Sequence, residues 1–235
     1  MNVLVIAAHP DDEILGMAGS IKKFSLRHDV YVCYMITSIT GRKNAPAAST
    51  KEMFIDGDGR KKQILKVQKI LNIKDTMTLD YPNIELNTVP TLDLVQSIEK
   101  AILLFKPEVI FTHYYNDLNE DHRIVFNATM AASKLPERRY NSELNIIKKI
   151  LCYEVPSSTN WSPKIADNYI YPDTYIDISD TFESKMEALK VYEKEIRNFP
   201  HPISYEAIKI TAQLHGGKIN SEYAEAFHLV REIVI

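Results

Sequence analysis

The amino-acid sequence predicts an α/β fold, a Rossmann-like three-layer sandwich built on a mostly parallel sheet. Short apolar runs alternate with stretches of helical periodicity along the 235 residues, a pattern typical of βαβ units with right-handed crossovers. Hydrophobic residues make up 45% and charged residues 25% of the chain, which is ordinary for a globular protein. The length suits one large domain with a sizeable core, and we treat residues 1–235 as a single domain.

Each expected element follows from its local pattern. The expected strands are the short apolar runs Asn2–Ala8, Val30–Ile36, Thr76–Leu79, Glu108–His113, Ile150–Glu154 and Thr174–Ile178. The expected helices, with apolar residues on one face, are Glu13–Arg27, Arg60–Leu71, Val89–Phe105, His122–Lys134 and Phe182–Asn198. Asp180 or Thr181 supplies the N-cap of the last one. Two long loops, Ser38–Gly59 and Pro156–Asp173, are either walls of a substrate cleft or plain surface excursions, and the sequence favours neither.

Charge and composition exclude several classes of partner. The formal net charge of -3 and the pI near 6.2 provide no basic surface for nucleic acid or an anionic membrane. The apolar runs are too short to span a bilayer. The N-terminal run has no basic region before it, so we do not interpret it as a signal peptide. Cys33 and Cys152 lie in strand-like runs and are expected to be buried free thiols. We therefore expect a cytoplasmic protein.

A polar string, His9–Glu13, directly follows the first expected strand. The carboxyl ends of strands are where open α/β sheets bind their ligands. Acidic residues are also favoured in the first turn of any helix, and Pro10 suits the first helical position. Those preferences explain one or two carboxylates, but they do not explain an imidazole beside three carboxylates in succession. The string therefore indicates a functional site.

A second polar cluster follows the expected strand at Glu108–His113 and ends at Asp121 and His122. If the two strands are close in the sheet, His122 completes a triad with His9 and Asp12. Three nitrogen and oxygen ligands with a fourth position open to water are typical of a catalytic zinc site. The same ligands suit Fe2+, Co2+ or Mn2+. Zinc would lower the pKa of its bound water to roughly 7, and Asp11 could then take the water's proton as general base.

These motifs carry a family resemblance that extends over most of the chain. The string Ala8–Glu13, with Asp121-His122 downstream, resembles the PIG-L/LmbE family of zinc-dependent N-acetylglucosamine deacetylases. Arg60–Gln63, and Gly217 with Tyr223–Phe227, resemble two further motifs of that family. The resemblance implies a metal-dependent hydrolase that removes the N-acetyl group from an N-acetylglucosamine-type sugar or sugar conjugate, with metal-bound water attacking the amide.

The resemblance also implies roles for individual residues. His9, Asp12 and His122 match the zinc ligands, and Asp11 matches the general base. Arg60 matches an arginine that holds the substrate. The expected partner is a small-molecule N-acetylated sugar, and homo-oligomer formation is left open.

The second motif departs from the family pattern at Asn119, where many members carry histidine. Asparagine can donate a hydrogen bond to an oxyanion but cannot give up a proton at neutral pH. The proton for the leaving amine then comes from Asp11 or from another histidine such as His113, which is otherwise a hydrogen-bonded residue at the strand end. The departure motivates an alternative: a non-catalytic carbohydrate-binding or regulatory protein that keeps the fold and metal site. Ester or phosphoester hydrolysis at a dinuclear centre would need more ligands.

Three more acidic residues have two interpretations each. Asp121 either fixes an imidazole or a backbone amide beside the metal, or it caps the following helix. Glu13 orients the first cluster or starts its helix. Asp117 makes a water-mediated substrate contact or belongs to a loop turn.

Overall fold

A seven-stranded sheet in the order β3-β2-β1-β4-β5-β7-β6 forms the middle layer of the computed structural model, which describes residues 1–37, 57–135, 146–163 and 172–234. The strands of the described part are β1 (Asn2–Ala7), β2 (Asp29–Tyr34), β3 (Asp75–Thr78), β4 (Val109–His113), β5 (Lys149–Tyr153), β6 (Thr174–Asp177) and β7 (Ala224–Glu232). Neighbouring strands from β3 to β5 are parallel, and β7 is antiparallel to both β5 and β6. The predicted fold class is confirmed.

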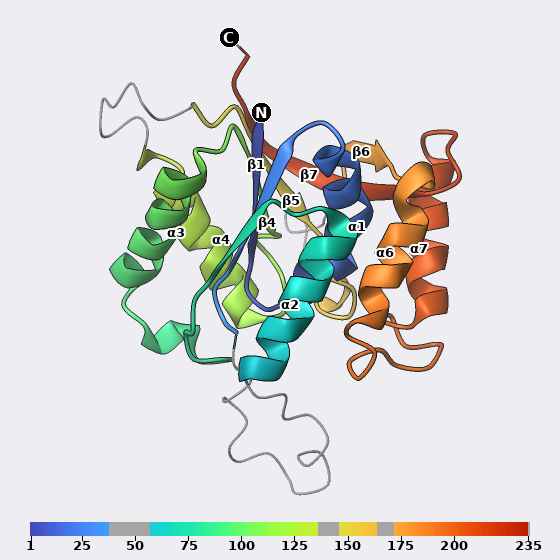
Figure 1. The fold of residues 1–235 in the computed structure, drawn as a ribbon, viewed down its shortest axis with the longest axis horizontal. Helices are drawn as coiled ribbons and strands as arrows, with labels where there is room; N and C mark the ends of the chain where they lie inside the picture. Colours follow the sequence, from blue (N-terminus) through green and yellow to red (C-terminus); the bar gives the residue numbers. More distant parts are fainter. Residues whose placement is uncertain (38–56, 136–145, 164–171, 235) are drawn as a thin grey trace, which may run out of the picture.

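Helices cover both faces of the sheet (Figure 1). The α-helices of the described part are α1 (Asp12–Ser25), α2 (Gly57–Leu71), α3 (Thr91–Phe105), α4 (Glu120–Ala132), α6 (Phe182–Lys190) and α7 (Tyr205–Gly217). The short 3-10 helices are η1 (Leu86–Thr88), η2 (Thr159–Trp161) and η4 (Ser179–Thr181). Apolar side chains of α1, α2 and α6 pack on one face and those of α3 and α4 on the other. Because both faces are covered, β1 is apolar after Asn2, and β4 is buried along its whole length.

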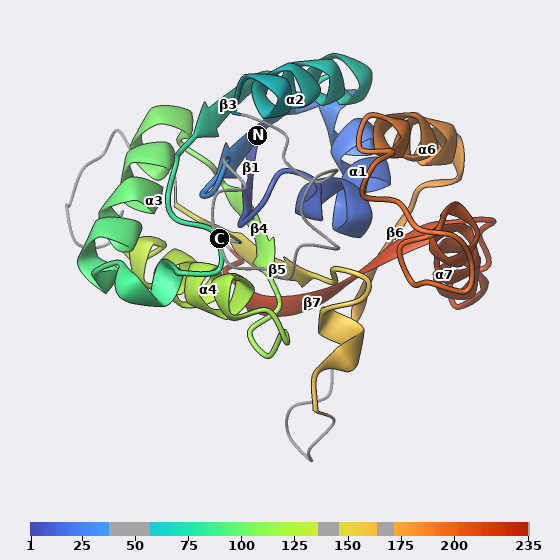
Figure 2. The ribbon, with the colours of Figure 1, turned by 90° about the horizontal axis from the view of Figure 1, so that it is seen from below.

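The order of the strands brings the two polar clusters together. Along the chain, β2 and β3 are added to the sheet on one side of β1. The helix α3 then leads back to β4, which lies on the other side of β1. Val3 of β1 pairs with Val109 of β4, and Val5 pairs with Phe111, so the two strands run parallel and end at the same edge. Figure 2 shows β1 and β4 side by side, with the helices arranged around them. A reversal of strand order is where doubly wound sheets bind their ligands.

The C-terminal part differs from expectation. The predicted helix Phe182–Asn198 is too long, because α6 ends at Lys190 and tight turns follow it. These turns direct Tyr192 and Glu195 towards the helix α2. The helix α7 and the strand β7 were not predicted. The sequence of β7 lacks the regular apolar pattern of a strand, because one of its buried positions is the acidic Glu225.

Other expectations can be compared with the described residues. Cys33 and Cys152 are free and buried, as predicted. Residues 38–56 of the first predicted loop and 164–171 of the second lie outside the described part. In the part that is described, we find no helix with the length and apolar character that a bilayer crossing requires.

Candidate metal centre

The turn between β1 and α1 is held in an unusual backbone conformation. Asp11, the N-cap of α1, has a φ of 138° and its side chain makes no capping hydrogen bond. Its backbone N–H donates instead to Oε2 of Glu13 at 3.1 Å, and the Tyr34 hydroxyl donates to Oε1 of Glu13 at 2.8 Å. Burial raises the pKa of Glu13 to about 7. Residues with strained backbone cluster at functional sites, and here the strained Asp11 keeps its carboxylate free of the ordinary capping role.

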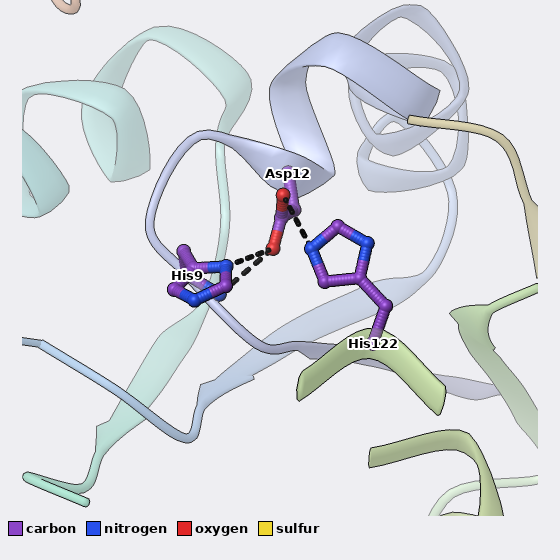
Figure 3. Close-up of side chains that lie close together, drawn as sticks. All are labelled: His9, Asp12 and His122. Carbon is purple, nitrogen blue, oxygen red and sulfur yellow. Dashed lines mark hydrogen bonds and ion pairs between the residues drawn. The ribbon is translucent and has the colours of Figure 1, made fainter. Parts of the chain in front are cut away.

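His9, Asp12 and His122 come together at the edge where β1 and β4 end. Each offers one ligand atom, and these atoms lie within 4.8 Å of one another. Figure 3 shows Asp12 between the two imidazole rings, 3.2 Å from Nδ1 of His9 and 3.4 Å from Nε2 of His122. The side chains of Asp12 and His122 are buried, whereas His9 is 20% exposed. Solvent therefore reaches the group on the side of His9.

The donor set fits a divalent cation. Two imidazoles and one carboxylate are ligands that zinc accepts in catalytic sites. Both ring nitrogens of His122 are buried and lack a hydrogen bond of normal geometry among the described residues. Buried polar atoms without such a partner call for an explanation, and coordination of an ion by one of the nitrogens supplies it.

Opposite charges dominate the electrostatics of the group. Burial acts to raise the pKa of Asp12, but the three surrounding histidines lower it well below its ordinary value. Burial acts to lower the pKa of His122, but Asp12 and Asp117 raise it to about 10. The site therefore favours the ionised form of Asp12 and a positive charge next to it.

Asp121 and Asp117 each contact one histidine of the triad. Oδ2 of Asp121 lies 3.3 Å from Nε2 of His9 and accepts the N–H of Ile84 at 2.7 Å. Ile84 has a φ of 61°, which is rare for a β-branched residue. Oδ2 of Asp117 lies 3.3 Å from Nδ1 of His122. Such carboxylates fix the orientation of ligating imidazoles.

The loop after β5 supports Asp117 from the other side. Thr159 and Ser158 donate their hydroxyls to Oδ2 of Asp117 at 2.5 and 3.0 Å. No local sequence motif marks these two residues. Their only signal was membership of the long loop that follows β5.

Asn119, and not Asp121, supplies the side-chain cap of α4. Its Oδ1 accepts the backbone N–H of Asp121 at 2.9 Å. His113 is fully buried and its Nε2 accepts the backbone N–H of Ala8 at 2.8 Å. Its ring stacks on that of His122, with centroids 4.0 Å apart. Burial and then His122 lower the pKa of His113 well below its ordinary value. This is the geometry of a hydrogen-bonded strand-end histidine.

Arg60 lies buried beside Asp11 and is not exposed for direct contact with a ligand. It is 2% exposed and donates from Nη1 to Oε1 of Glu195 at 2.5 Å, with its guanidinium 5.3 Å from the centre of the Tyr192 ring. Burial, and then the neighbouring Glu195, raise the pKa of Asp11 well above its ordinary value. Glu195 was missed because we placed it in the tail of a helix.

The fold and the site define an α/β protein with a candidate His-Asp-His metal centre at the switch point of its sheet. The chain belongs to the PIG-L family, described as GlcNAc-PI de-N-acetylase, whose model matches residues 4–133. A probable N-acetyl-alpha-D-glucosaminyl L-malate deacetylase from Bacillus anthracis is 24% identical over 195 residues, covering 81% of this chain and 80% of that protein.

Solved structures share the fold. A conserved protein from Thermus thermophilus has a TM-score of 0.75 at 20% identity, covering 99% of this chain and 96% of that one. The N,N'-diacetylchitobiose deacetylase from Pyrococcus horikoshii has a TM-score of 0.71 at 24% identity, covering 97% and 83%. A 4-carboxy-2-hydroxymuconate hydratase from Pseudomonas putida also reaches 0.75, at 18% identity and covering 100% and 98%. Because the deacetylase and the hydratase are named for different reactions, the fold alone does not define the chemistry.

Proposed function

We propose that this protein is a zinc-dependent N-deacetylase acting on an N-acetylglucosamine-type sugar or sugar conjugate. The observation that carries the proposal is the group of His9, Asp12 and His122 with the carboxylate of Asp11 beside it, free of a capping role. The family description and the deacetylase names of the relatives from Bacillus anthracis and Pyrococcus horikoshii support the same reaction.

His9, Asp12 and His122 would hold the ion, and Fe2+, Co2+ or Mn2+ would suit the same donors. When bound, such an ion polarises an amide carbonyl and lowers the pKa of a water molecule towards roughly 7. Asp11 takes the proton of the attacking water. Its carboxylate makes no capping hydrogen bond, and it is adjacent in sequence to Asp12.

Asp11 also donates the proton that the leaving amine needs, because Asn119 has no proton to give at neutral pH. We assign Asn119 a different task. Its Oδ1 faces the backbone of α4, which directs its Nδ2 group away from the cap to donate a hydrogen bond to the oxyanion of the amide carbonyl.

Arg60, Asp117 and His113 are the candidates for substrate contact, and they receive different assignments. Arg60 is buried and paired with Glu195, so it acts on the substrate side through Glu195, whose side chain is 26% exposed, and not by direct contact with the sugar. For Asp117 and His113 we propose a supporting role instead. Their polar atoms already contact His122 and the backbone of Ala8, and both side chains are buried.

An acetate-release assay on N-acetylglucosamine conjugates tests the proposal. Release should stop with a chelator and return with Zn2+. Asp11→Asn should keep the metal but lower turnover by about 10²–10⁴-fold, the usual effect of losing a general acid–base group. Asp29→Asn, at an exposed ion pair with Lys74, is the matched control and should keep full activity.

Three outcomes would count against parts of the proposal. Full activity of Asp11→Asn would exclude Asp11 as the base. Acetate release that survives the chelator would exclude metal dependence. Binding of N-acetylglucosamine conjugates by the zinc-loaded protein without acetate release would favour the non-catalytic alternative.

A further inference from the structure

The helix that carries Asp12 is broken near its middle. Met17 leaves the helical region, with φ −151° and ψ 24°, and divides α1 into a first segment that bears Asp12 and a second segment that packs under the sheet. A break of this kind leaves carbonyls at the end of the first segment and N–H groups at the start of the second without intrahelical partners. Because the break is buried, water cannot satisfy them.

A buried ion pair from two distant elements satisfies these groups. Lys185 of α6 donates to the carbonyl of Leu15 at 3.0 Å and to Oε1 of Glu225 at 2.6 Å. Glu225 of β7 accepts the N–H of Gly19 at 3.1 Å on Oε1 and the N–H of Ser20 at 2.7 Å on Oε2. Lys185 therefore satisfies a carbonyl of the first segment of α1, and Glu225 satisfies two N–H groups of the second.

The energetics favour a positioning role for the pair over a purely stabilising one. Both side chains are about 3% exposed, and such pairs are costly to desolvate. Two apolar residues of similar volume would fill the space as well, but they would leave the broken helix unsatisfied. Here the ammonium of Lys185 faces a backbone carbonyl of α1, and the carboxylate of Glu225 faces two of its backbone N–H groups.

The first segment of α1 has little freedom on its other side. A Cβ at Gly16 would lie 2.5 Å from Cδ2 of Tyr153 and 2.7 Å from the carbonyl oxygen of Glu154, so the segment lies directly against the end of β5. With β5 on one side and Lys185 on the carbonyl of Leu15, the position of Asp12 three residues earlier is defined.

We propose that Lys185 and Glu225 are positioning residues of the candidate metal centre: they hold the broken helix α1 so that Asp12 meets His9 and His122. The inference rests on the proposed metal-binding function. It assigns no contact with substrate or metal to either residue.

The test measures zinc affinity by chelator competition and amide exchange of Gly19 and Ser20, in the full chain. Glu225→Gln and Lys185→Met should weaken zinc binding by about 10–100-fold, the usual effect of removing a residue that orients metal ligands. Glu225→Gln should also accelerate exchange at both amides, and in both variants kcat for acetate release should fall more than KM rises.

Two control variants separate positioning from general destabilisation. Glu232→Gln lies on the same strand and breaks a half-exposed pair with Lys149, which has the same 2.6 Å separation. Ile98→Val truncates a fully buried residue of α3 on the opposite face of the sheet. Both should keep the zinc affinity of the unaltered protein, although Ile98→Val lowers the melting temperature. If Glu225→Gln does not fold, Glu225→Asp keeps the charge with a shorter reach and should show an intermediate loss of affinity.

The outcomes distinguish this inference from the function on which it rests. Failure of the unaltered protein to bind zinc contradicts the proposed function. Unchanged zinc affinity in folded variants, with faster exchange at Gly19 and Ser20, contradicts the positioning role alone. An equal loss of affinity in Ile98→Val also overturns it, because the effect would then follow stability.

Discussion

Oδ2 of Asp117 lies 3.3 Å from Nδ1 of His122, on the side of the ring opposite to the nitrogen that faces Asp12. Thr159 donates to the same carboxylate oxygen at 2.5 Å. The contact places a carboxylate against Nδ1 and leaves Nε2 on the side of Asp12, and the partner of one imidazole nitrogen influences which nitrogen is available to an ion.

The first prediction concerns this contact. Asp117→Asn keeps the shape of the side chain but removes its charge, so zinc affinity should fall by about 10–100-fold. Thr159→Val removes one hydroxyl donor and leaves the carboxylate, so its effect should be smaller. Chelator competition measures both. Equal affinity in Asp117→Asn and the unaltered protein would show that the carboxylate does not orient His122.

Asn119 allows the cap of α4 to be separated from catalysis. Asn119→Ala removes the cap and should lower the free energy of unfolding by about 1 kcal/mol. Asn119→Ser retains a capping oxygen and should stay close to the unaltered protein in urea denaturation. Both lose the amide donor, so both should lose about 10²–10³-fold in acetate release. Normal turnover in Asn119→Ser would remove Asn119 from the proposed oxyanion contact.

His215 of α7 makes the stability depend on pH. Burial, and then Lys218 and Lys185, lower its pKa to about 4, whereas Glu225 acts in the opposite direction. The unfolded chain has a histidine pKa near 6.5. Between these two values only the unfolded state binds the proton, so His215 stabilises the fold above about pH 6.5, and this contribution is lost as the pH falls towards 4.

The variant His215→Gln should reduce that loss. Urea denaturation of both proteins at pH 7 and pH 5 gives the difference, in which the other titrating groups largely cancel. The free energy of unfolding should fall less between the two pH values in His215→Gln. The same fall in both proteins would mean that His215 is not held neutral in the folded state.

The central part of the fold could be predicted from local patterns. The continuous apolar run at the N-terminus indicated a strand buried on both faces, and the structure places β1 in the middle of the sheet. The adjacency of β1 and β4 could only be assumed, because strand order depends on which side of β1 the chain returns to after β3. His9 and His122 meet because of that return.

The contacts missed by sequence reasoning share one property: they join residues that are far apart in the chain. Glu195 pairs with Arg60 across 135 positions, and Glu225 reaches the N–H of Gly19 across 206. Periodicity describes the residues on one element and carries no information about such partners. A buried glutamate also interrupts the apolar pattern by which a strand is identified, which is why β7 was not expected.

Two glycines give a matched pair for the last prediction. Gly16→Ala places a Cβ 2.5 Å from Cδ2 of Tyr153 and 2.7 Å from the backbone carbonyl oxygen of Glu154, the residue after β5, which cannot give way as a flexible side chain would. The variant should lose about 1–3 kcal/mol of stability, as overpacking does, and zinc affinity should fall because the segment bearing Asp12 is displaced. Gly217→Ala, at the end of α7, meets nothing within 4 Å. It should be neutral or gain up to about 1 kcal/mol from helix propensity, with zinc affinity unchanged. Denaturation and chelator competition on both variants check the prediction, and a Gly16→Ala protein that binds zinc normally would show that this contact does not define the site.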